Sequence, residues 1–187
     1  MTLSEEKTIL YLTDFPSLIK ITEQDILQFL SSYTESILQV KEALKKPLSF
    51  KVIFKDALIA DNCRKEMNLK KYKNKSIRIM WDEHDSSILY NITNNLFFKG
   101  ISKNITPRKV YEYFLKFGDI SSCKMTEDEN GNHYGYGYVT FYEAKAAKAA
   151  LDHSKEKKIE EFDDNFLEIS FFQNKMKELL NQTMFII

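Results

Sequence analysis

Apolar and polar residues in this chain alternate with the period of a strand in some segments and with the period of a helix in others. In the N-terminal half, apolar residues from Ile26 to Tyr33 recur at helical spacing after Thr22, a residue suited to cap a helix. A second helix is predicted over 56–67. Strands are predicted at 8–12, 37–42, 48–54 and 76–81. The predicted order is therefore β-α-β-β-α-β.

The C-terminal half repeats this order. Helices are predicted after Thr106-Pro107, with proline at the tolerated first position, and over 144–151. Strands are predicted at 96–99, 120–126, 135–141 and 167–172. Leu10 and Leu96 lie 86 residues apart, so the repeat covers almost half of the chain. The pattern predicts an α+β fold of two tandem ferredoxin-like sandwiches, each with a four-stranded antiparallel sheet backed by two helices.

The repeat predicts the domain organisation. We expect a first domain at 1–81, a linker at 82–95 and a second domain at 96–173. The tail at 174–187 has apolar residues at helical spacing and is predicted to be helical. It would either pack on the second domain or dock another protein, and the sequence leaves both alternatives open.

Composition and charge limit the classes of function. Apolar residues make up 43% and charged residues 29% of the chain, values typical of folded domains, and no apolar run is long enough to span a membrane. The 27 basic and 27 acidic residues balance, which argues against a nucleic-acid binder that works mainly by counterion release. The two cysteines and three histidines lack the spacing of metal ligands. We therefore expect no metal site and no cofactor.

Aromatic residues cluster on one face of the second predicted sheet. The third strand of that domain places Tyr134, Tyr136 and Tyr138 on one face, because successive side chains of a strand alternate. The same alternation places Phe97 and Lys99 on the open face of the first strand. Exposed neighbouring rings without a covering helix form a stacking platform for unpaired bases. A protein partner or the tail covering these rings is the alternative.

Two of these segments resemble a known family. Leu96–Ile101 and Tyr134–Phe141 resemble the two ribonucleoprotein motifs of the RNA recognition motif. Four further short segments resemble the first two such domains of the cytoplasmic poly(A)-binding proteins: 78–81, 95–99, 122–124 and 128–131. The resemblance covers roughly residues 8–175 and implies tandem RNA recognition motifs.

The resemblance implies roles for residues of the second domain. Phe97 and Tyr138 would each stack a base, and Tyr136 would pack on a ribose. Lys99 and Lys124 would contact bases or phosphate.

The first domain departs from the pattern of the family. The resemblance makes Tyr11 a stacking residue, Asp14 a reader of adenine and Trp81 an adenine contact. Ser49 and Lys51 stand where the third strand would offer aromatic residues, and we include Lys51 among the RNA-binding residues. The resemblance therefore implies that the first domain is a divergent RNA recognition motif with an incomplete platform.

Other departures bear on base preference. Gly100 replaces an asparagine, and Glu83 stands where the family has a base-reading glutamine. Glu168 lies in the outward register of the last strand and would place a carboxylate near the RNA.

The sequence thus predicts a monomeric protein of mRNA metabolism or translation that binds A-rich single-stranded RNA without catalysis. We expect it in the cytoplasm and also consider the nucleus. A translation factor would bind the helical side of the second domain, as the resemblance implies. The alternative is a protein-interaction module that docks a translation or RNA-processing factor and has little affinity for RNA. An enzyme on the same topology is a third reading, which lacks a paired nucleophile and base.

Overall fold

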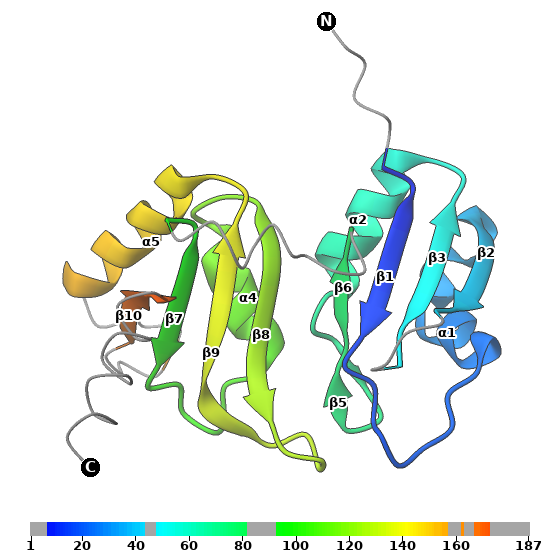
Figure 1. The fold of residues 1–187 in the computed structure, drawn as a ribbon, viewed down its shortest axis with the longest axis horizontal. Coiled ribbons are helices and arrows are strands. Elements are labelled where there is room, and N and C mark those ends of the chain that lie inside the picture. Colours follow the sequence, from blue (N-terminus) through cyan, green and yellow to red (C-terminus); the bar gives the residue numbers. More distant parts are fainter. Residues whose placement is uncertain (1–6, 44–47, 82–92, 157–161, 163–166, 173–187) are drawn as a thin grey trace, which may run out of the picture. The chain divides into compact units, whose positions relative to one another are not determined.

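The chain folds into two compact units, one built mainly from its N-terminal half and the other mainly from its C-terminal half. The computed structural model describes residues 7–43, 48–81, 93–156, 162 and 167–172. Each unit contains a four-stranded antiparallel sheet and two α-helices (Figure 1). The predicted α+β fold class is confirmed. Most of the predicted linker and all of the predicted tail lie outside the described residues.

The sheet of the N-terminal unit has the strand order β2-β3-β1-β6. Its strands are β1 (Ile9–Thr13), β2 (Ile37–Glu42), β3 (Phe50–Phe54) and β6 (Arg78–Met80). Its helices are α1 (Glu23–Phe29) and α2 (Ala57–Met67). Both helices contribute side chains to the core on one face of this sheet. The opposite face is called the open face below.

The first helix begins where the sequence predicts and ends earlier. The Thr22 hydroxyl accepts from the Asp25 backbone N–H at 3.3 Å, and the Asp25 carboxylate accepts from the Thr22 backbone N–H at 2.8 Å. This capping box fixes the first turn. The prediction of a helix reaching Tyr33 is wrong, because residues Ser31–Ser36 form a 3-10 helix. The Thr34 hydroxyl donates to the Ser31 carbonyl at 3.0 Å, and such local bonds compete with a continued α-helix.

A two-stranded hairpin precedes the last strand of the N-terminal unit and was not predicted. It consists of β4 (Lys71–Tyr72) and β5 (Lys75–Ser76). Lys73 lies in the turn with φ of 53°, a conformation that non-glycine residues seldom adopt. The last strand is consequently shorter than the predicted 76–81.

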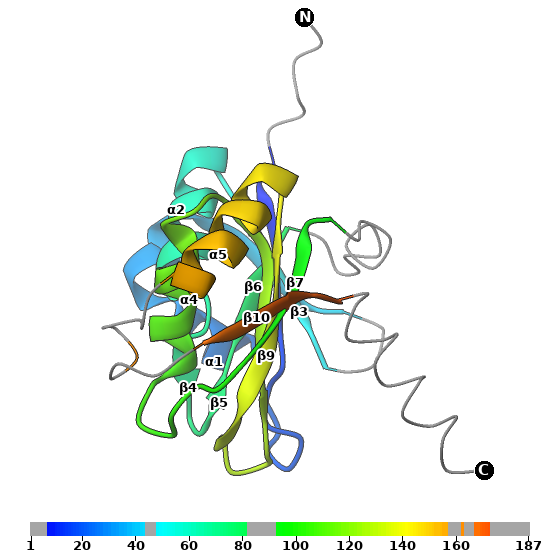
Figure 2. The ribbon, with the colours of Figure 1, turned by 90° about the vertical axis from the view of Figure 1, so that its left-hand side faces the viewer.

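The sheet of the C-terminal unit has the strand order β10-β7-β9-β8. Its strands are β7 (Asn95–Lys99), β8 (Ile120–Glu127), β9 (His133–Phe141) and β10 (Glu168–Phe171). Its helices are α4 (Pro107–Leu115) and α5 (Ala144–Glu156), which lie on one side of the sheet in Figure 2. Thr106 caps α4, as its hydroxyl accepts from the Lys109 backbone N–H at 3.2 Å. Strand for strand, the two units share one topology.

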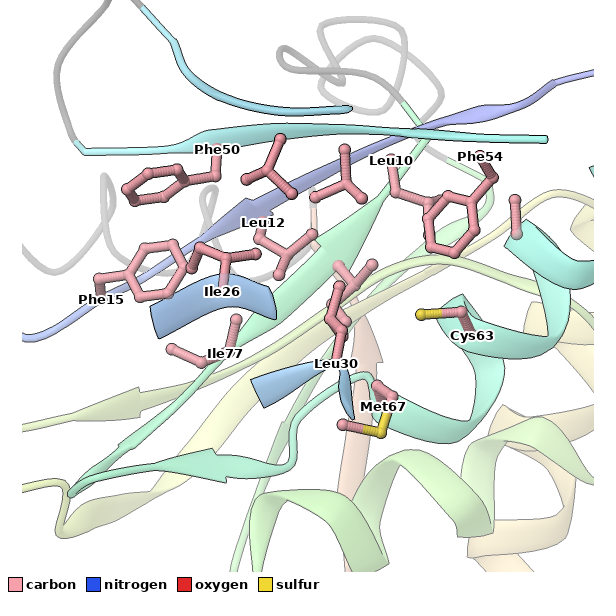
Figure 3. Close-up of a cluster of buried hydrophobic side chains, with 14 of the residues drawn as sticks. Leu10, Leu12, Phe15, Ile26, Leu30, Phe50, Phe54, Cys63, Met67 and Ile77 are labelled. Atoms are coloured by element: carbon pink, nitrogen blue, oxygen red, sulfur yellow. The ribbon is translucent and has the colours of Figure 1, made fainter. Parts of the chain in front are cut away.

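The core of the N-terminal unit lies between the sheet and its two helices (Figure 3). Leu10, Leu12 and Phe50 point into it from the sheet, Ile26 enters from α1 and Cys63 from α2. Burial raises the pKa of the Cys63 thiol to about 12, with a smaller contribution from the nearby Glu66 carboxylate. A thiol in this setting stays protonated at neutral pH and acts as a small apolar side chain.

Candidate nucleic-acid interface

The open face of the C-terminal sheet carries one row of side chains from four neighbouring strands. In the antiparallel register, Lys124 of β8 lies opposite Tyr138 of β9, and Tyr138 lies opposite Phe97 of β7. Phe97 in turn lies opposite Ser170 of β10. Opposite residues point to the same face of a sheet. This row, Lys124-Tyr138-Phe97-Ser170, is the central row of the C-terminal sheet.

The predicted cluster of rings is confirmed by the distances between them. The Phe97 ring centroid lies 5.4 Å from that of Tyr138 and 6.1 Å from that of Tyr136. Tyr134 stacks on Tyr136 with a centroid distance of 6.3 Å and an angle of 23° between the planes. Four aromatic residues from β7 and β9 therefore form one continuous surface, which we call the aromatic cluster.

The prediction that these rings lie bare is wrong for Phe97. Only 7% of Phe97 is exposed, whereas Tyr136 and Tyr138 are half-buried and Tyr134 is 62% exposed. Phe97 lies on an inner strand, and the two neighbouring tyrosine rings occlude part of it. Burial raises the pKa of the Tyr138 hydroxyl, and the nearby Tyr136 hydroxyl adds to this effect. Of these rings, the tyrosines therefore expose more of their surface on the open face than Phe97 does.

Gly137 allows β9 to pack closely against its neighbours. A Cβ atom at this position would lie 2.2 Å from the Lys124 carbonyl oxygen and 2.6 Å from the Phe98 ring. Both distances are shorter than any real contact of a Cβ atom. The close packing of β9 between Tyr136 and Tyr138 therefore depends on glycine at this position.

An ion pair lies beside the aromatic cluster. Lys99 is opposite Tyr136 on one side and opposite Glu168 of β10 on the other. Its ammonium lies 2.8 Å from the Glu168 carboxylate, and Glu168 is 68% exposed. The predicted outward register of Glu168 is confirmed. The carboxylate neutralises the lysine that was predicted to contact RNA, while Lys124 at the other edge stays exposed.

The N-terminal sheet has a corresponding row, in which the edge lysine is kept and the residue of the third strand is a lysine instead of a tyrosine. Lys41 of β2 lies opposite Lys51 of β3, Lys51 lies opposite Tyr11 of β1, and Tyr11 lies opposite Met80 of β6. This row, Lys41-Lys51-Tyr11-Met80, is the central row of the N-terminal sheet. Lys51 takes the place that Tyr138 has in the C-terminal unit. Tyr11 is therefore the single ring of this row. Ser49, two residues before Lys51, is buried and adds no ring beside it.

Lys41 is a candidate residue that sequence reasoning missed. It occupies the edge position that Lys124 occupies in the C-terminal sheet, opposite the third strand. The repeat length alone does not align the two lysines, because the connections between the paired strands differ in length. The register of the hairpin between β2 and β3 would have identified it, since Lys51 was already a candidate.

Asp14 is held by its neighbours at the end of β1. It has φ of 68°, and its carboxylate accepts from the Thr13 hydroxyl at 3.0 Å. The Arg78 guanidinium lies 3.2 Å from the other carboxylate oxygen. To read adenine, as the resemblance implies, the Asp14 carboxylate would have to bind the base while it also contacts Thr13 and Arg78.

Trp81 lies with the core of its unit. Its ring packs against the core cluster, and the Arg64 guanidinium of α2 lies 5.5 Å from the ring centroid. The Arg64 guanidinium also forms an ion pair with the Asp61 carboxylate of the same helix, with a nitrogen–oxygen distance of 2.7 Å. Because α2 covers the face opposite Tyr11, the structure does not bring Trp81 together with the other predicted RNA-binding residues.

Comparison with known proteins agrees with the geometry of the C-terminal unit. Residues 96–163 match the family model described as RNA recognition motif. The C-terminal unit is therefore similar to this family over the matched residues. This match includes β7 and β9, the strands that carry the aromatic cluster, and it supports RNA binding by the unit. The N-terminal unit has the RNA recognition motif-like fold, with the same strand order.

The chain is also similar to several solved structures. The first two RNA recognition motif domains of the yeast poly(U)-binding protein Pub1 are 21% identical, with a TM-score of 0.38 over 88% of this chain and 98% of that one. A complex of the sex-lethal protein with RNA is 16% identical, with a TM-score of 0.40 over 88% and 98%. The C. elegans NONO-1 homodimer is 16% identical, with a TM-score of 0.40 over 89% of this chain. The chain covers 62% of that nematode chain, less than two thirds of its length.

Two kinds of feature are absent from the described part of the chain. No helix in it is long and apolar enough to cross a membrane. Within the same residues, no group of three or more histidine, cysteine, aspartate and glutamate side chains is arranged to hold a metal ion.

Proposed function

We propose that this chain binds single-stranded RNA by stacking bases on the aromatic cluster of its C-terminal RNA recognition motif. The observation that carries the proposal is the contact of Phe97, Tyr136 and Tyr138 on the open face of the sheet. Every base has a flat face, so such rings bind unpaired bases of any sequence. Lys124, exposed at the edge of the same row, supplies a cation for the backbone.

We further propose that A-rich RNA is preferred and that the chain acts in mRNA metabolism or translation. This part rests on the resemblance of 78–81, 95–99, 122–124 and 128–131 to the poly(A)-binding proteins. The cytoplasm is the proposed compartment, with the nucleus as a second one. A translation factor on the helical side of the C-terminal unit is the proposed protein partner of a monomeric chain.

Competition among homopolymers tests both parts. A labelled oligo(A) is bound to the full chain, and unlabelled oligo(A), oligo(U), oligo(C) and a mixed sequence compete for it. We expect all to compete and oligo(A) to compete best. Equal competition by all four would leave RNA binding in place and refute the A-rich preference. No binding of any of them at micromolar concentrations would refute the function itself.

The burial of Phe97 favours a second candidate function, a protein-interaction module with little affinity for RNA. In that case the rings serve mainly to hold the sheet together, and the N-terminal unit docks a translation or RNA-processing factor. Substitution of Tyr136 by alanine separates the two functions. It should weaken RNA binding under the first and leave any residual RNA binding unchanged under the second.

A further inference from the structure

We propose that the open face of the N-terminal sheet binds the phosphate groups of single-stranded RNA through Lys41 and Lys51, largely without regard to the bases. The inference rests on the proposed RNA binding and assigns the N-terminal unit a ligand chemistry different from that of the aromatic cluster. Its basis is the central row of the N-terminal sheet, Lys41-Lys51-Tyr11-Met80.

Two lysines in this row repel each other in the free protein. Lys41 and Lys51 lie directly opposite on neighbouring strands, and like charges in such a pair destabilise a sheet. Among the described residues, neither lysine forms an ion pair. The Asp14 carboxylate on this sheet is engaged by Arg78. An anion that lies between the two ammonium groups would remove the repulsion.

Comparison of the two sheets indicates which anion fits. Both rows have a lysine on the edge strand, Lys41 in one and Lys124 in the other, and both have a ring on the inner strand, Tyr11 in one and Phe97 in the other. The difference that changes the charge of the row is Lys51, which stands where Tyr138 would stack a base. The N-terminal row therefore presents two cations beside one ring. A nucleotide strand supplies matching groups, with phosphates for the lysines and one base or ribose for Tyr11.

Ser49 supports this assignment. It lies where Tyr136 lies in the C-terminal unit and is buried, so it offers no second ring for a base. With a single ring in reach, the N-terminal sheet has little means of binding bases by stacking. The two lysines supply attraction that is independent of sequence.

The first test measures salt dependence. The double variant Lys41→Gln/Lys51→Gln is compared with wild type and with Lys109→Gln/Lys148→Gln, which removes the same charge from exposed positions on α4 and α5. Oligo(A) affinity is measured over a range of salt concentrations. Log affinity falls as log salt rises, and each lost phosphate contact should make this negative slope shallower by about 0.7. The loss of two contacts should therefore make it shallower by about 1.4. At 0.1 M salt this corresponds to a loss of about 25-fold. The control variant should keep the wild-type slope.

The second test removes the bases. An oligo(A) long enough for one sheet, about two or three bases, is compared with the same oligonucleotide extended at either end by abasic ribose-phosphate units. We expect at least one extension to strengthen binding to wild type and to Tyr11→Ala. Neither extension should strengthen binding to the double lysine variant. Oligo(Glu) is added as a competitor that represents an acidic protein segment. It should displace the abasic extension from the N-terminal sheet only poorly.

Several results would overturn the inference. An unchanged salt slope in the double lysine variant, no gain from either abasic extension, or displacement by oligo(Glu) as strong as by abasic phosphate would each do so. These results differ from the result that would refute the proposed function. That function would be refuted if Tyr138→Ala kept wild-type affinity for oligo(A). The thermal midpoint of the double lysine variant is the folding control. It should equal or exceed that of wild type, because the substitution removes a like-charge pair.

Discussion

Substitution of Tyr138 by alanine is the most direct test of the aromatic cluster. Tyr138 lies in the central row of the C-terminal sheet, with Phe97 at 5.4 Å on one side and Phe172 at 5.3 Å in an edge-on contact. Stacking of a base on such a ring contributes about 1–3 kcal/mol. Its loss should therefore raise the Kd for oligo(A) roughly 5- to 150-fold.

The same substitution also costs stability, and the two effects must be separated. Each ring pair contributes about 0.5–1.5 kcal/mol, so removal of two pairs should lower the free energy of unfolding by roughly 1–3 kcal/mol. RNA affinity is therefore measured by fluorescence anisotropy well below the thermal midpoint of the variant. Circular dichroism at the same temperature establishes that the variant is folded.

Two control variants define what the assay reports. Tyr138→Phe keeps the ring and should bind RNA nearly as well as wild type. Tyr142→Ala removes an exposed tyrosine just beyond β9 and should leave the affinity unchanged. If folded Tyr138→Ala bound oligo(A) within about twofold of wild type, base stacking on this ring would be refuted.

Three further predictions concern other parts of the molecule. Gly137→Ala should lower the free energy of unfolding by about 1–3 kcal/mol in urea titrations, because the Cβ atom of the alanine would lie 2.2 Å from a backbone oxygen. Glu168→Gln should free Lys99 and tighten RNA binding about fivefold at 0.1 M salt, an effect that should vanish near 1 M. Hydrogen bonds from the Thr22 hydroxyl, the Tyr72 hydroxyl and the Thr22 backbone lower the pKa of Asp25 from 3.8 to about 2. The stability that Asp25 contributes is therefore present above pH 4 and lost as the pH falls toward 2, and acid unfolding of Asp25→Asn should lack this contribution.

Much of the fold could be predicted because local signals and the repeat agree. The bounds of β2 were predicted exactly, and Thr22 and Thr106 begin helices as expected. The repeat then fixed the order of the elements in one half by reference to the other. The errors lie where side chains compete with the backbone. Ser31 and Thr34 form a local bond just beyond the end of α1, and the turn at Lys73 adds a hairpin.

The candidate site was predictable in part, for a different reason. Alternation along a strand determines which face a residue occupies, so the contact of Phe97 with Tyr136 and Tyr138 followed from the sequence. Alternation does not determine how far a ring is covered by its neighbours, and the burial of Phe97 was therefore missed. Trp81 was assigned by resemblance alone, and in the structure it packs against the core beside Arg64.

The register between strands adds what neither pattern nor resemblance supplies. It shows that Lys51 lies between Lys41 and Tyr11, whereas Tyr138 lies between Lys124 and Phe97. Lysine in place of tyrosine at this position is the difference on which the proposed phosphate binding by the N-terminal sheet rests. The N-terminal unit need not be regarded as a failed copy of the C-terminal one. Because phosphate contacts and base stacking are separate sources of affinity, the two proposed sheets would together let a chain with balanced charge bind RNA through its backbone and through its bases.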